Sequence, residues 1–175
     1  MKTLIMFLFL ASLITLTGCS PYIVNYDYDM EYDFTQLNTF DWFSIPETVQ
    51  VDELIVKRVK NAVNRQLADK GLSKVSENPD FLIALHLVRQ WKRDVDFGYS
   101  SRRYGSYWTR SSINVYDYEE GTLVVDFIDS DKRELIWRGS VSAVVDSDAG
   151  PEKREKRINE AVSKVLEKFP PVQSK

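Results

Sequence analysis

The chain has 175 residues, a formal net charge of −3, 13% aromatic residues, one cysteine and one histidine. The mild negative charge argues against a nucleic-acid partner. A single cysteine excludes an internal disulfide, and one Cys plus one His are too few for a typical zinc site. We therefore expect a fold held together by packing alone, with no metal and no cofactor.

The N-terminal residues have the pattern of a bacterial lipoprotein signal peptide. Lys2 precedes the apolar run 4–16, which is shorter than the roughly 20 residues of a transmembrane helix. Leu16-Thr17-Gly18-Cys19 then resembles a lipobox, where the signal peptide is cut and the cysteine is acylated. We expect residues 1–18 to be the signal peptide, residues 19–175 to be one domain and Cys19 to be the lipidation site. An ordinary signal peptide cut elsewhere is the alternative.

The residue after Cys19 bears on localisation. Stable anchoring takes more than one acyl chain, and lipoproteins that this chain resembles carry two or three, palmitate among them. In such lipoproteins an Asp after the cysteine often signals retention in the inner membrane, whereas this chain has Ser20. We expect a lipid-anchored protein of the outer membrane that faces the periplasm and contacts the membrane through its N-terminal lipid.

The first half of the domain predicts two strands and a helix. The strands are expected at residues 23–26 and 39–43, and the helix at residues 52–70. Asp52 suits the N-cap, and Gly71 suits a left-handed C-terminal cap with Leu72 folded back onto Leu67. One apolar stripe at helical spacing supports the helix: Ile55, Val56, Val59, Ala62, Val63 and Leu67.

The second half predicts four strands. The apolar run 81–88 suits a central strand, and residues 113–117 suit another that ends in a turn at residues 119–121. Residues 122–129 and 133–145 suit a hairpin that sets Phe127 opposite Trp137, with Asp126 opposite Arg138 on the other face. The apolar face of this hairpin is expected to hold Leu123, Val125, Phe127, Leu135, Trp137, Val141 and Ala143.

A second helix is expected to begin at Pro151, a favoured first helical residue. Its apolar stripe is Ile158, Ala161, Val162, Val165, Leu166 and Phe169. The order β-β-α-β-β-β-β-α predicts an α+β fold, a two-layer sandwich with a mostly antiparallel sheet and two amphipathic helices on one face.

Several short motifs in order resemble one bacterial lipoprotein family, catalogued as domain of unknown function 4136. The resemblance covers nearly the whole mature chain and implies a lipid-anchored α+β domain in the envelope. It implies no activity and no functional residues. The matching pieces are the lipobox, Asp27-Tyr28-Asp29, Phe40-Asp41-Trp42, Gly71 followed by Asn78-Pro79-Asp80, Glu120-Gly121-Thr122-Leu123-Val124-Val125-Asp126, Ile136-Trp137-Arg138-Gly139, and Phe169-Pro170-Pro171.

The sequence offers few catalytic candidates. His86 is the only histidine, so a nucleophile–histidine arrangement would need it, but its place within an apolar strand favours a half-buried histidine with a structural partner. An oxygen-only calcium site is an alternative for two acidic stretches, although neither has the twelve-residue loop pattern. These stretches are Asp27, Asp29, Glu31 and Asp33, and Asp126, Asp129 and Asp131.

Residues 91–110 have a distinctive composition, with six aromatics and five cations against two Asp. Tyr, Trp and Arg are favoured at binding hot spots. We predict a binding loop for an envelope protein, a glycan or an anionic headgroup, with a hairpin whose aromatics cover the open face of the sheet as the alternative. The candidate residues are Trp91, Phe97, Tyr99, Arg102, Arg103, Tyr104, Tyr107 and Trp108.

The sequence thus predicts a lipid-anchored envelope lipoprotein that is a non-enzymatic binding or structural module. The alternative is a hydrolase that acts on an envelope polymer through paired carboxylates.

Overall fold

The computed structural model describes residues 21–43, 52–98 and 112–171. These residues form a six-stranded mixed sheet in the order β1-β6-β5-β4-β2-β3. The pairs β1–β6, β6–β5 and β5–β4 are antiparallel, whereas β2 is parallel to β3 and β4. The elements are β1 Ile23–Tyr28, η1 Phe34–Gln36, β2 Thr39–Trp42, α2 Glu53–Asp69, β3 Ser73–Lys74, β4 Phe81–Gly98, β5 Ser112–Asp129, β6 Leu135–Val144 and α3 Pro151–Leu166.

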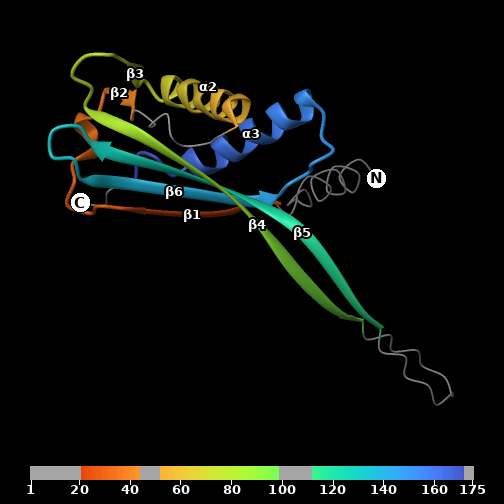
Figure 1. Cartoon of the computed structure of the whole chain (residues 1–175). Helices are drawn as coiled ribbons and strands as arrows, with labels where there is room; N and C mark the ends of the chain where they lie inside the picture. Colours follow the sequence, from red (N-terminus) through yellow and green to blue (C-terminus); the bar gives the residue numbers. More distant parts are fainter. Residues whose placement is uncertain (1–20, 44–51, 99–111, 172–175) are drawn as a thin grey trace, which may run out of the picture.

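Helices α2 and α3 lie on the same side of the sheet (Figure 1). Each helix fully buries part of the apolar stripe that the sequence predicts: Val59, Ala62, Val63 and Leu67 of α2, and Val162, Val165 and Leu166 of α3. Phe169, predicted as part of the second stripe, is buried but lies after the end of α3 at Leu166. The α+β sandwich with two helices on one face is therefore confirmed. The other face of the sheet is left open by the described helices.

The ends of α2 are fixed by local chemistry that the sequence predicts. The Asp52 carboxylate accepts the backbone N–H groups of Leu54 and Ile55 at 3.1 and 3.2 Å. At the other end Gly71 has φ +86°, a conformation that favours glycine. The Leu72 N–H donates to the Leu67 carbonyl at 3.0 Å, which completes a Schellman motif.

The core is an aromatic cluster between the sheet and the helices. Phe127 lies opposite Trp137 as predicted, with ring centroids 4.9 Å apart. Phe169 contacts Phe127 edge to face at 4.5 Å, and the Phe81 ring lies 4.9 Å from Phe127 and 6.1 Å from Phe169, between ring centroids. Because rings from β4, β5, β6 and the segment after α3 meet here, this cluster joins the two layers.

Two predictions for the second half are wrong. The expected turn at residues 119–121 does not occur, because β5 runs without a break from Ser112 to Asp129. The glycine instead permits close packing, since a Cβ on Gly121 would lie 3.0 Å from Cγ2 of Val145. Leu135, expected inside, is 45% exposed, because a bulge beside Phe127 and Ile128 shifts the register and buries Ile136 in its place.

Candidate functional site

Strands β4 and β5 pair along their whole length and extend beyond the rest of the sheet. The register runs from Phe81 opposite Asp129 to Gly98 opposite Ser112, whereas β2 pairs only with residues 81–83 of β4 and β6 only with residues 120–128 of β5. We call residues 91–98 and 112–119 the ribbon. Within the described chain its two strands pair only with each other, apart from the Val145 N–H that donates to the Glu119 carbonyl at its base. Figure 1 shows the ribbon projecting from the body.

Ion pairs between the strands stabilise the charged part of the ribbon. Arg93 lies opposite Asp117 and donates Nε and Nη2 to the two carboxylate oxygens at 2.8 and 3.2 Å. This hydrogen-bonded guanidinium lowers the pKa of Asp117. Lys92 pairs with Glu120, and Arg89 pairs with Glu119 at 3.6 Å. The local excess of cations in the sequence is therefore offset by acids of β5 in the described part.

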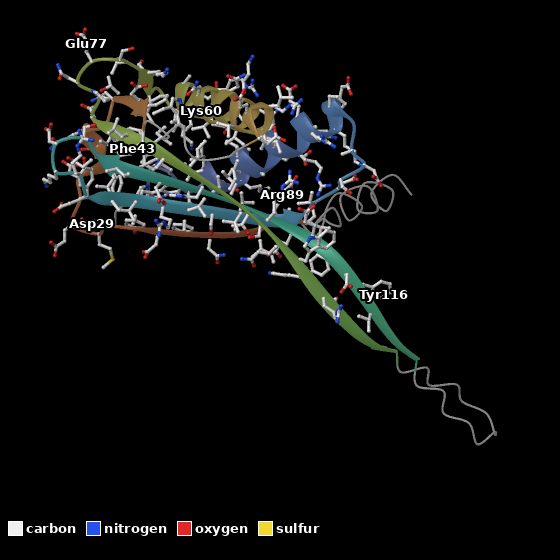
Figure 2. All side chains as sticks on the ribbon, in the orientation of Figure 1. Asp29, Phe43, Lys60, Glu77, Arg89 and Tyr116 are labelled. Atoms are coloured by element: carbon white, nitrogen blue, oxygen red, sulfur yellow. The ribbon has the colours of Figure 1, made fainter. Side chains whose placement is uncertain are left out.

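The ribbon also exposes large apolar and aromatic side chains. Trp91 is 77% exposed, Tyr116 59% and Val115 52%. Figure 2 shows Tyr116 on the ribbon, away from the helices, and Arg89 where the ribbon meets the sheet. Trp91 is thus available for contact and does not cover the sheet.

Part of the segment predicted to be a binding loop is a strand. Trp91 and Phe97 lie in β4, because cross-strand pairing continues the strand to Gly98. The other candidates lie outside the described residues: Tyr99, Arg102, Arg103, Tyr104, Tyr107 and Trp108. Cys19, the predicted lipidation site, also lies outside them.

The open face of the sheet holds a buried carboxylate between two bases. Asp126, only 4% exposed, accepts hydrogen bonds from Nε and Nη2 of Arg138, both at 2.6 Å. Nε2 of His86 lies 3.3 Å from Oδ2 of the same carboxylate, the oxygen that also accepts from Nη2 of Arg138. The predicted pairing of Asp126 with Arg138 is confirmed. His86 lies in a strand and has a structural partner as expected. It is exposed and not half-buried, because α2 and α3 both cover the opposite face of the sheet (Figure 1).

The acidic stretches considered for calcium serve as local caps. Asp29 accepts the Glu31 N–H at 2.8 Å, and Asp33 accepts the Thr35 N–H at the start of η1. Asp129 accepts the N–H groups of Asp131 and Lys132 at 3.0 and 2.7 Å. Among the described residues, no group of three or more His, Cys, Asp or Glu side chains is arranged to hold a metal ion.

A cluster of hydrogen-bonded acids lies at the end of the sheet away from the ribbon. Burial alone would raise the pKa of Asp80. The backbone N–H groups of Asn38 and Thr39 donate to its Oδ2 atom, both at 2.8 Å, and these hydrogen bonds lower the pKa by more than burial raises it. The pKa of Asp129 is also lowered on balance. Burial raises it, but the hydrogen bonds that its carboxylate accepts from backbone N–H groups and from the Tyr32 hydroxyl lower it by more. The general acid of a glycosidase needs a raised pKa. These two carboxylates are therefore better suited to accept structural hydrogen bonds than to act as a general acid.

A groove of about 430 Å³ that sequence reasoning missed lies between α2 and the β2–β3 edge. Trp42 donates its indole N–H to Asn64 at 3.1 Å, and Nζ of Lys60 lies 5.0 Å from the ring centroid. Val56, Lys60 and Asn64 recur every four residues, so the sequence does predict that these three residues of the groove wall share one face of a helix. The lining residues are Trp42, Glu53, Val56, Lys57, Lys60, Asn61, Asn64 and Lys74.

The fold therefore defines an α+β domain with helices on one face of a mixed sheet and a projecting ribbon. The family model described as Domain of unknown function (DUF4136) matches residues 24–171, and the chain belongs to this family. The predicted family resemblance is confirmed. A search of curated proteins finds no match. None of the described helices is long and apolar enough to cross a membrane.

Among the solved structures that are similar to this chain are a PDZ domain protein and the PelC dodecamer. A PDZ domain protein from Parabacteroides distasonis aligns with a TM-score of 0.56 at 14% identity, over 88% of this chain and 36% of that chain. This chain thus spans about a third of the length of that relative, and the likeness concerns the fold alone. The PelC dodecamer from Paraburkholderia phytofirmans aligns with a TM-score of 0.48 at 12% identity, over 88% of this chain and 99% of that chain.

Proposed function

We propose that this chain is a lipid-anchored lipoprotein of the bacterial outer membrane, and that its domain is a non-enzymatic binding or structural module. The observation that carries the proposal is the lipobox ending in Cys19, directly after the apolar run 4–16. The folded domain follows almost at once, because the Tyr22 hydroxyl already donates to Glu160 at 3.0 Å. An acylated Cys19 would therefore hold the domain close to the membrane.

The ribbon is the surface that best suits contact with a partner. Its exposed Trp91 and Tyr116 are residue types favoured at binding hot spots. The sequence between its two strands adds the aromatic and arginine residues at 99–108. We assign the partner to the envelope, as a protein, a glycan or a lipid headgroup.

The anchor is tested by Cys19→Ser, with the neighbouring Ser20→Ala as the matched control. We expect Cys19→Ser to lose radiolabelled palmitate and to stay uncleaved or become soluble, whereas Ser20→Ala keeps the label and the membrane fraction. Normal processing and membrane retention of Cys19→Ser would contradict the proposal.

The outer-membrane assignment is tested separately by Ser20→Asp. If Ser20 permits export to the outer membrane, the Asp variant should move to the inner-membrane fraction on a sucrose gradient, while Ser20→Ala stays in place. The assignment fails if the unaltered protein already fractionates with the inner membrane.

The partner surface is tested by photocrosslinking in intact cells. A photoreactive residue is placed at Trp91 or Tyr116, with Glu77 as the control, because Figure 2 shows Glu77 on a loop far from the ribbon. We expect a defined adduct from the ribbon and none from Glu77, with mass spectrometry telling protein, glycan and lipid apart. Equal capture from all three positions, or none, would count against a binding module.

A further inference from the structure

The start of β1 and the base of the ribbon lie at the same end of the sheet. Ile23 pairs with Ser142, Ser142 with Thr122 and Thr122 with Val88. Because β1 and β4 run in opposite directions, the N-terminal end of β1 points in the direction in which β4 continues to Gly98. The N-terminal end of β1 and the ribbon therefore lie at the same end of the body.

The connection between the anchor and the body is short. The Tyr22 hydroxyl donates to Glu160 Oε2 at 3.0 Å and to the Arg157 carbonyl at 3.3 Å, so α3 fixes the chain at this point. Three residue steps separate Tyr22 from Cys19, and a fully extended chain covers at most about 11 Å in three steps. If Cys19 carries lipid, Tyr22 cannot lie far above the headgroups.

The ribbon reaches much further than this connection. From Val88, level with Ile23, β4 continues for ten residues, about 30 Å of strand. The opposite orientation would place the body between Tyr22 and the bilayer. The six residue steps from Tyr22 to Tyr28 alone span about 20 Å, which the connection cannot cover. The ribbon must therefore run along the membrane surface or into it.

The backbone hydrogen bonding of the ribbon favours a position along the membrane surface over insertion into the bilayer. In the described chain, the outer edges of both ribbon strands have no neighbouring strand. Unpaired backbone groups are not tolerated in the hydrocarbon core, whereas water and headgroups can satisfy them at the surface. A lone two-stranded ribbon is also marginal in water, so a surface along its length would stabilise it.

The side chains agree with a place among the headgroups. Trp and Tyr concentrate at membrane–water interfaces, and Trp91 and Tyr116 are exposed on the ribbon. By the strand register, Val115 lies on the same face of the ribbon as Trp91, and it is 52% exposed. This face of the ribbon thus presents both an interfacial aromatic and an apolar side chain.

We propose that the ribbon lies along the headgroup layer of the membrane that holds Cys19, with Trp91 in the interface, as a second contact between protein and bilayer. The inference rests on the proposed lipid anchor. It adds an orientation, since the domain would be held by two points instead of rotating about a single tether.

Quenching of Trp91 by brominated lipid tests the orientation in the full lipidated chain. The protein carries Trp42→Phe and Trp108→Phe, which leaves Trp91 and the buried Trp137 as emitters. It is reconstituted into vesicles of phosphatidylethanolamine and phosphatidylglycerol that contain dibrominated phosphatidylcholine. We expect the share of emission from Trp91 to be lost. The control with the additional Trp91→Phe change should emit equally with and without bromine.

Each result bears on a different step. Absence of acyl groups on Cys19, or failure to float with vesicles, would overturn the anchor and the orientation together. Flotation with Trp91 unquenched by bromine but quenched by aqueous acrylamide would overturn only the orientation. Flotation with Trp91 protected from both quenchers, and a crosslinked dimer through the ribbon, would assign the ribbon to a second copy of the chain and also overturn it.

Discussion

Gly139 lies directly against Trp137 in β6: a Cβ on Gly139 would come within 2.3 Å of Cη2 of the indole and 2.6 Å of Cγ2 of Val165. The glycine is required here by space and not by backbone conformation. Its bare backbone lets the indole lie flat between the sheet and α3.

Gly139→Ala should therefore destabilise the fold. Neither the buried ring nor Val165 can move freely, and overpacking of this kind costs roughly 1–3 kcal/mol. Chemical denaturation measures the loss. Ser140→Ala, on the open face of the same strand, is the control and should change stability by less than about 0.5 kcal/mol. Equal stability of the two variants would show that the layers can separate without cost.

Trp137→Ala should cost about 3–5 kcal/mol, because the indole is fully buried. Trp137→Phe should cost clearly less, since the indole Nε1 makes no hydrogen bond among the described residues and none is lost. The exposed Trp91→Ala is the control for loss of an indole without loss of core. A cost below about 1 kcal/mol for Trp137→Ala would mean that the faces of the sheet are reversed.

The acid sensitivity of the fold should depend in part on Asp80. Its folded pKa lies below the ordinary value of 3.8, so the unfolded chain takes up a proton at a higher pH than the folded chain does. The stabilisation is therefore complete at neutral pH and is lost as the pH falls below about 4 through the folded pKa.

Asp80→Asn removes this charged acceptor for the Asn38 and Thr39 N–H groups. We expect a loss of about 1 kcal/mol at neutral pH, a figure reduced because the carboxylate is half-exposed. The loss should shrink toward pH 3. Asp94→Asn, an exposed acid of the ribbon, is the control in the same urea titrations. A loss that stays constant with pH would show that Asp80 acts through shape and not through charge.

Helices and the main hairpin could be predicted from the sequence because their signals are local. The stripe of α2, its cap at Asp52 and the alternation around Phe127 each depend on residues within a few positions of one another. The local sequence at Gly121 predicts a turn, because a glycine after two glutamates is typical of one. Its actual role depends on Val145, which a local pattern cannot show.

The extent of the ribbon could not be predicted for the same reason. The stretch from Arg89 to Asp94 has poor strand propensity, and its strand depends on partners such as Asp117 more than twenty residues away. The Trp42 groove likewise unites β2, α2 and Lys74 of β3. Of the candidate site, the sequence located the segment and the exposed Trp91, but not the strand that carries it.

The ribbon should be dispensable for the stability of the body. Joining Trp91 to Glu119 through Asn-Gly, a dipeptide suited to a two-residue hairpin turn, removes residues 92–118 and keeps every pair that β5 makes with β6. Shortening a connection changes closure entropy only slightly, so the unfolding free energy should change by less than about 1 kcal/mol. Gly139→Ala, measured alongside, shows that the assay detects a real loss. If the shortened chain unfolds, side chains between residues 92 and 118 pack on the body, and the ribbon is part of the core and not a free contact surface.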